Sequence, residues 1–152
     1  MRHKGWVEQQ SLSFVDDLTS LYNQKGFMLF AQQQLSIAIR TKRGMILFLI
    51  HIEGLNEINE KFGNQYEYLA KIETANILKE AFRESDIIAC HGRDEFTAIA
   101  IESFDANNEI IITRLQDELE NCNKQENRQY KLSLCIGKAY YDTEELCTIE
   151  EL

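Results

Sequence analysis

The stretch Ile87-Ile88-Ala89-Cys90-His91-Gly92-Arg93-Asp94-Glu95-Phe96 decides the fold of this chain. It opens with an apolar run and then forms a polar corner that contains a glycine, and a second apolar run continues from Phe96 to Ile101. Two apolar runs that are joined by such a corner predict a β-hairpin. The hairpin carries two adjacent carboxylates, Asp94 and Glu95, on or beside its turn.

Helix and strand patterns alternate around this hairpin. Apolar residues at helical spacing predict helices at about Asn23–Thr41, Asn56–Phe62, Gln65–Arg83 and Asp105–Cys122. Strands are expected at Met45–Ile52, which is apolar at nearly every position, and at Tyr130–Ile136, with a continuation through Ala139–Tyr141. This order predicts an α/β fold, an α+β sandwich in which helices cover a mixed central sheet of about five strands.

Charge and composition exclude several classes of protein. The 152 residues suit one domain, and a net charge of −9 disfavours partners such as nucleic acid backbones and anionic membrane surfaces. The longest apolar run, Met45–Ile50, is too short to cross a bilayer, and the N-terminus lacks the hydrophobic segment of a signal peptide. The 4 cysteines are scattered, which indicates free thiols in a reducing compartment. We therefore expect a cytoplasmic domain without membrane contact.

Four segments resemble the motifs of one family, in the family's order and at its spacing. Gly92–Phe96 resembles Gly-Gly-Asp/Glu-Glu-Phe, the signature of GGDEF domains, with Arg93 in place of the second glycine. The other segments are Asp16–Asn23, His51–Asn64 and Leu132–Gly137. The chain is thus identified as a degenerate GGDEF domain with a nucleotidyl-cyclase-like fold. Active members of this family are diguanylate cyclases, which join two GTP molecules into cyclic di-GMP.

The resemblance also sets the expected domain boundaries. The GGDEF domain spans residues 16–152, and we expect it to lack the family's last helix, because the chain stops about where that helix begins. Residues 1–15 mix apolar and polar side chains and are expected to form a lead-in helix or linker. We expect that the domain can be attached to other signalling domains or can form a homodimer.

The resemblance implies a damaged catalytic site. In the family, the metal is held by an aspartate at the end of the buried strand and by the third residue of the signature turn. Asp94 keeps the turn position, with Glu95 beside it, but His51 stands at the strand position, and imidazole is a poor Mg²⁺ ligand. Glu53 lies on the same face of an extended segment and is the nearby substitute. These three carboxylates are therefore interpreted as vestigial, and Mg²⁺ is expected only together with GTP. The alternative is a structural histidine beside a solvated hairpin corner.

The nucleotide-binding positions that the resemblance implies are partly altered. Asn59 is kept from the pair that reads the guanine edge, but Tyr68 replaces its aspartate partner and Asn56 replaces a phosphate-contacting lysine. Gly92 is kept, whereas Arg93 replaces the glycine that lets the backbone approach a phosphate. The charge of Arg93 can still contact a phosphate. Together these changes argue against an active cyclase.

Arg83 and Asp86 form an Arg-x-x-Asp pair, and five residues separate Asp86 from Gly92. This register resembles the product-inhibition site of many GGDEF cyclases, and Arg114 falls where some relatives supply a second arginine. An arginine fork can bind phosphate or the O6 and N7 atoms of guanine, and a carboxylate can accept from guanine N–H groups. The alternative is an ordinary ion pair at the end of a helix.

These observations favour a binding module. The first hypothesis is a cyclic di-GMP sensor that uses Arg83, Asp86 and Arg114. The alternatives are a diguanylate cyclase with residual activity, and a non-catalytic module that binds GTP or dimerises and regulates a partner domain.

Overall fold

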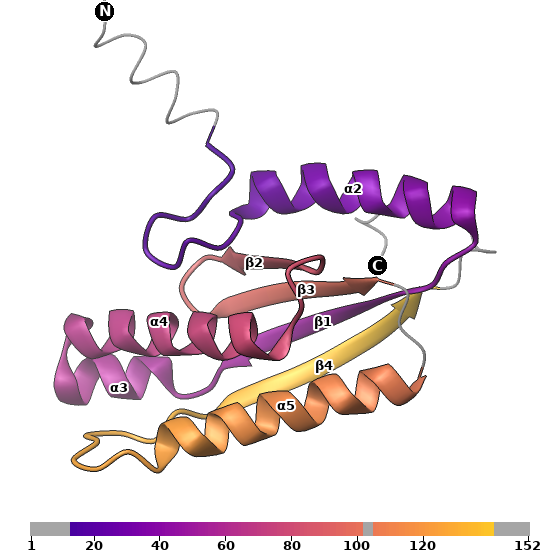
Figure 1. Ribbon diagram of the computed structural model, residues 1–152. Helices are drawn as coiled ribbons and strands as arrows, with labels where there is room; N and C mark the ends of the chain where they lie inside the picture. The colour runs from indigo at the N-terminus through magenta and orange to yellow at the C-terminus, as the bar shows by residue number, and fades with distance from the viewer. Residues whose placement is uncertain (1–12, 102–104, 142–152) are drawn as a thin grey trace, which may run out of the picture.

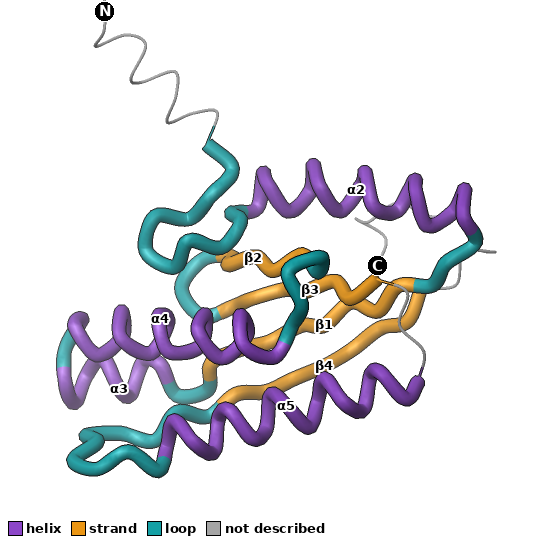
Figure 2. Tube along the Cα trace, viewed as in Figure 1, coloured by secondary structure: helices purple, strands orange, loops and turns teal. Residues whose placement is uncertain are grey.

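The computed structural model describes residues 13–101 and 105–141, and the fold is α+β as expected. The elements in chain order are α2 (Gln24–Thr41), β1 (Met45–Ile52), α3 (Leu55–Phe62), α4 (Asn64–Ala81), β2 (Ile87–His91), β3 (Glu95–Ile101), α5 (Asp105–Asn123) and β4 (Leu134–Tyr141). Helix α2 lies on one side of the sheet, and α3, α4 and α5 lie on the other (Figure 1). The hairpin turn and the end of β1 meet at the same end of the sheet (Figure 2).

The sheet differs in detail from the expected mixed sheet of about five strands. The described residues form 4 strands in the order β2-β3-β1-β4, and each neighbouring pair is antiparallel. Within these residues, parallel pairing is limited to an isolated bridge between Tyr22 and Ala89. A uniformly apolar strand is typical of a parallel sheet. Here β1 is apolar because it lies at the centre of an antiparallel sheet with helices on both faces.

The two faces of β1 contribute to two separate cores. The even-numbered residues from Ile46 to Ile52 pack with α3, α4 and α5, whereas Met45 and Leu47 pack with α2. Leu49, the next residue on the α2 side, is 51% exposed. Because α2 packs mainly on β2, it leaves this end of the face open, and His51, the candidate site residue on β1, lies there.

Local signals explain where the helices begin and end. Asn23 caps α2 as expected, because its Oδ1 accepts a hydrogen bond from the backbone N–H of Gly26 at 2.9 Å. Gly63 ends α3 with a φ of +99°, a left-handed conformation that favours glycine. Helix α4 ends at Ala81 rather than at Arg83, because Phe82 is extended. None of the helices in the described part of the chain is long and apolar enough to cross a membrane.

The last strand begins later than expected. Strand β4 starts at Leu134, not at Tyr130, and it continues through Gly137 to Tyr141. Leu132 is fully buried, but its N–H and C=O bind the side chain of Asn123 at 2.8 and 2.9 Å. The alternation that predicted a strand therefore comes from a loop that is clamped by a side chain.

The expectations for both ends of the chain fall largely outside the described residues. Of the predicted lead-in segment 1–15, the structure describes residues 13–15, where Val15 forms an isolated bridge with Tyr22. The predicted loss of the last helix concerns residues beyond 141.

Candidate functional site

The end of β1 and the hairpin turn bring His51 and Asp94 together, as the sequence predicted. His51 Nε2 lies 3.0 Å from Asp94 Oδ2, and the backbone N–H of Ile52 donates to the carbonyl of Asp94 at 2.8 Å. The strand register places Glu95 directly opposite His51. The side chains of His51 and Asp94 are 49% and 33% exposed, so both can be reached from solvent.

Glu53 is engaged elsewhere. Its carboxylate accepts a hydrogen bond from Ser133 Oγ at 2.8 Å, and its backbone N–H donates to the carbonyl of Ser133 at 2.9 Å. It also lines a hollow of about 380 Å³ between α3 and the loop that precedes β4. The predicted substitution of Glu53 for the missing metal ligand gains no support from this geometry.

The donor set at the turn does not fit Mg²⁺. Magnesium prefers oxygen ligands, above all carboxylates, and Asp94 is already paired with an imidazole. The described residues contain no group of three or more His, Cys, Asp or Glu side chains that could hold a metal ion. The predicted role of Asp94 as a metal ligand therefore gains no support from this geometry.

Arg93 fastens the hairpin turn to α3 and α4. Its guanidinium donates to Asn56 Oδ1 at 2.8 Å and to Glu67 Oε1 at 2.5 Å. Asn59 also donates to Glu67 Oε1, at 2.7 Å, and Lys71 Nζ donates to the carbonyl of Gly92 at 3.1 Å. We call the contacts of Arg93 with Asn56 and Glu67 the hairpin clamp.

The hairpin clamp is an ion pair whose two members stabilise each other's charge. The hydrogen bond from Arg93, followed by the one from Asn59, lowers the pKa of Glu67 despite the burial of its carboxylate. The bond to Glu67 in turn raises the pKa of Arg93. The Glu67 side chain is 10% exposed and that of Arg93 is 50% exposed. The clamp is thus a charged contact with a buried acceptor and an accessible donor.

Glu67 is a candidate site residue that the sequence analysis did not identify. The predicted guanine-reading position, Tyr68, is 51% exposed. Glu67, one residue earlier, supplies the carboxylate that contacts Asn59. The available signal was Arg93 itself, because a guanidinium presents a fork of donors that suits a carboxylate. The turn geometry is otherwise kept, since Gly92 has a φ of +66°.

Arg83 and Asp86 form the second candidate site. Asp86 Oδ2 accepts from the backbone N–H of Arg83 at 2.9 Å, and Asp86 Oδ1 lies 3.4 Å from the Arg83 guanidinium. The Asp86 side chain is fully buried, whereas the Arg83 side chain is 53% exposed. Both residues line a hollow of about 440 Å³ whose other walls include Tyr22 and Lys79. We call this hollow the Arg83 hollow.

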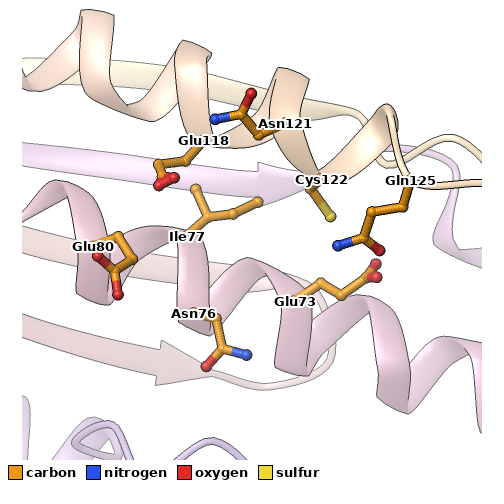
Figure 3. Close-up of a pocket in the computed structure, with 8 residues that line it drawn as sticks. All are labelled: Glu73, Asn76, Ile77, Glu80, Glu118, Asn121, Cys122 and Gln125. Carbon is orange, nitrogen blue, oxygen red and sulfur yellow. The ribbon is translucent and has the colours of Figure 1, made fainter.

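Arg114 lies on α5, on the far side of α4 from the N-terminal segment. Helices α4 and α5 run antiparallel and enclose a pocket of about 250 Å³, in which Glu118 lies opposite Glu80 and Gln125 opposite Glu73 (Figure 3). Arg114 is one turn before Glu118 and is exposed. It is not among the residues that line the Arg83 hollow, so the structure brings together two of the three predicted residues.

A network beside this pocket anchors the loop before β4. Arg128 donates to both oxygens of Glu73 at 2.7 and 3.0 Å, and the Tyr130 hydroxyl also donates to Glu73. Burial raises the pKa of Glu73, but the bonds from Arg128 and Tyr130 outweigh it and the net shift is downward. Burial and the bond to Glu73 raise the pKa of Tyr130. We call these three residues the Glu73 network.

Comparison with known proteins gives a family match over most of the chain. The family model described as diguanylate cyclase, GGDEF domain, matches residues 13–152. The probable diguanylate cyclase DgcJ of Escherichia coli (strain K12) is 30% identical over 97 residues, which are 64% of this chain and 19% of DgcJ. The bifunctional diguanylate cyclase/cyclic di-GMP phosphodiesterase MucR of Pseudomonas aeruginosa is 25% identical over 130 residues, which are 86% of this chain and 19% of MucR. The chain therefore spans about a fifth of the length of these relatives.

Solved structures share the fold. The GGDEF domain of FimX from Pseudomonas aeruginosa superposes with a TM-score of 0.76 at 22% identity, covering 90% of this chain and 85% of that one. The coiled coil and GGDEF domain of DgcB from Caulobacter crescentus, solved in complex with c-di-GMP, gives a TM-score of 0.78 at 17% identity, covering 95% and 76%. At these identities the likeness establishes the fold alone.

Proposed function

The chain belongs to the GGDEF domain family of diguanylate cyclases, and from that premise we propose that it is a non-catalytic cyclic di-GMP sensor that binds its ligand at the Arg83 hollow. The observation that carries this proposal is the half-exposed guanidinium of Arg83, which lies against a fully buried carboxylate at the wall of a hollow of about 440 Å³. A hollow of that size is within the range of small-molecule sites, about 300–1,000 Å³.

The chemistry of the Arg83 hollow suits a guanine nucleotide. Arg83 offers a planar fork for phosphate oxygens or for the O6 and N7 atoms of guanine. Lys79 adds a second cation to the wall, and Tyr22 adds an aromatic ring on which a base can stack. Although the net charge is −9, distant charges are screened over about 10 Å at ordinary ionic strength, so the local cations dominate. Arg114 does not line the hollow, so its contact with the ligand stays a prediction.

The geometry at the turn supports a non-catalytic role. Phosphoryl transfer depends on metal and on charged groups that face the reacting phosphates. Here Asp94 is paired with His51, and Arg93 occupies the space between the turn and α4 with its own contacts. The second candidate function is a GTP-binding module or a cyclase with residual activity. It is favoured by the partly exposed Asp94 and by the amide of Asn59, which lies beside the carboxylate of Glu67.

Calorimetric titration tests the proposal. Cyclic di-GMP should bind the wild type in the micromolar range, and GTP with Mg²⁺ should bind more weakly. Arg83→Ala should lose about 1–3 kcal/mol of binding free energy, since a bidentate contact is removed. Arg40→Ala, an exposed arginine in the last turn of α2, is the matched control and should bind like the wild type.

Two outcomes would overturn the sensor. One is the absence of heat for cyclic di-GMP at micromolar protein, and the other is unchanged affinity in Arg83→Ala. Either result would favour a dimerisation or partner-regulating role, which sedimentation of the isolated domain would then address.

A further inference from the structure

The hairpin clamp has the composition of a ligand site that already holds a ligand. Glu67 provides a carboxylate that is 10% exposed, and Asn56 provides a neighbouring amide oxygen 2.8 Å from the same guanidinium. A guanidinium presents a planar row of N–H donors that matches a carboxylate. In this chain the row of donors comes from Arg93, whose side chain is 50% exposed.

We propose that Arg93 is a built-in occupant of the Glu67 acceptor site and that it excludes external ligands with a planar edge of N–H donors. Free guanidinium ion and the N1–H and N2–H₂ edge of guanine belong to this class. Adenine does not, since its corresponding edge carries an acceptor at N1. Glu67 Oε1 already accepts from Arg93 and from Asn59, so a further donor edge cannot pair with this oxygen while Arg93 is in place. The hairpin clamp lies on a different surface from the Arg83 hollow, and its proposed role does not depend on that hollow.

Three observations distinguish the clamp from an ordinary surface ion pair. Its acceptor is buried, whereas surface pairs such as Lys124–Glu120 have side chains that are both at least 65% exposed. The same acceptor oxygen also receives the Asn59 amide at 2.7 Å, and the contacts lower the pKa of Glu67. Removal of the guanidinium would therefore leave a buried carboxylate without one of its hydrogen-bond donors. The cost of this missing bond favours a replacement ligand that donates in its place.

The test uses guanosine and adenosine monophosphates as probes and Arg93→Ala as the main variant. Alanine suits this position, since Arg93 is not among the described residues with a positive φ, and Gly92 keeps the turn. Arg93→Ala should bind guanosine monophosphate at least 10-fold more tightly than the wild type and should prefer it to adenosine monophosphate. Arg40→Ala, the distant control, should show no gain.

Two double variants locate the gain. Arg93→Ala with Glu67→Gln should return to the wild-type affinity, because the charged acceptor is lost. Arg93→Ala with Arg83→Ala should keep the gain, which separates this site from the Arg83 hollow and from the sensor proposal. The inference is overturned if Arg93→Ala binds the guanine probe no better than the wild type, or if the gain survives Glu67→Gln.

Arg93→Lys provides a second measurement that does not require loss of the charge. Lysine can bond to one acceptor but lacks the fork that reaches both Asn56 and Glu67. We expect its affinity for guanosine monophosphate to lie between those of the wild type and Arg93→Ala. If Arg93→Lys binds guanosine monophosphate only as tightly as the wild type does, the guanidinium fork of Arg93 does not exclude the ligand. This measurement remains decisive even if the alanine variant does not fold.

Discussion

Replacement of Arg128 by alanine should destabilise the domain through the Glu73 network. Arg128 makes two bonds to Glu73, and their side chains are only 11% and 15% exposed. Its guanidinium also lies 4.9 Å from the centre of the Tyr130 ring. Without Arg128, Glu73 keeps the hydroxyl of Tyr130 but loses the counter-ion of a largely buried charge.

The size of the effect follows from these contacts. Removal of one partner of a buried ion pair lowers the free energy of unfolding by about 3–5 kcal/mol, and a hydrogen bond to a charged group contributes about 1.5–3 kcal/mol. Because Tyr130 still donates to Glu73 and both charges keep some solvent contact, we expect a loss of about 2–4 kcal/mol in the free energy of unfolding. With a urea m-value of about 1–2 kcal/mol/M, the unfolding midpoint should fall by roughly 1–4 M.

Urea unfolding followed by far-ultraviolet circular dichroism measures this loss. The matched control is Lys124→Ala, which removes a pair with Glu120 at 3.5 Å whose side chains are 68% and 65% exposed. That change should cost about 0–0.5 kcal/mol. The double variant Glu73→Gln/Arg128→Ala should cost less than the sum of the two single changes, because each leaves the other partner unmatched. Equal losses in Arg128→Ala and Lys124→Ala would refute the argument.

Three further outcomes are expected. Incubation of the domain with GTP and Mg²⁺ or Mn²⁺ should give no cyclic di-GMP above a blank, and product that disappears in Asp94→Ala would show an active site. Gly26→Ala should lower the free energy of unfolding by about 1–3 kcal/mol, because the new Cβ would lie 2.3 Å from the backbone oxygen of Phe14, while Gly137→Ala, with no atom within 4 Å, should cost far less. The lowered pKa of Glu67 means that its stabilising contribution is full above the ordinary glutamate pKa of about 4.3 and is lost as pH falls through the lower folded-state value. Glu67→Gln should therefore lose less stability than the wild type between about pH 5 and pH 2, as measured by urea midpoints.

Signals that are local in sequence predicted the structure well. The cap at Asn23 and the apolar spacing after it depend on residues within one or two helical turns, and α2 follows them from Gln24 to Thr41. The hairpin likewise depends on a single turn at Gly92. The resemblance to the GGDEF family predicted that His51 and Asp94 share one site, and their 3.0 Å contact confirms that they meet.

Features that depend on distant partners could not be predicted from patterns. Leu69, an apolar residue of α4, is 40% exposed, whereas Ala70 and the polar Thr74 are buried. The direction of the strands and the late start of β4 depend on pairing and on the side chain of Asn123, which local alternation does not encode. Glu67 resembles any solvent-facing charge on a helix until its partner, 26 residues later, is known.

The two candidate sites lie at opposite ends of β2, and this arrangement predicts that they act independently. Asp86 precedes the strand and Arg93 follows it. Between them, β2 is held by its ladder with β3 on one edge and by two backbone hydrogen bonds with Tyr22, of 3.1 and 2.9 Å, on the other. A strand with partners on both edges cannot slide without losing several backbone bonds, each of which contributes about 0.5–1.5 kcal/mol. Release of Arg93 should therefore leave the Arg83 hollow in place, and cyclic di-GMP should bind Arg93→Ala almost as tightly as the wild type. A several-fold change in that affinity would mean that β2 moves despite these bonds, and that the hairpin couples the two sites.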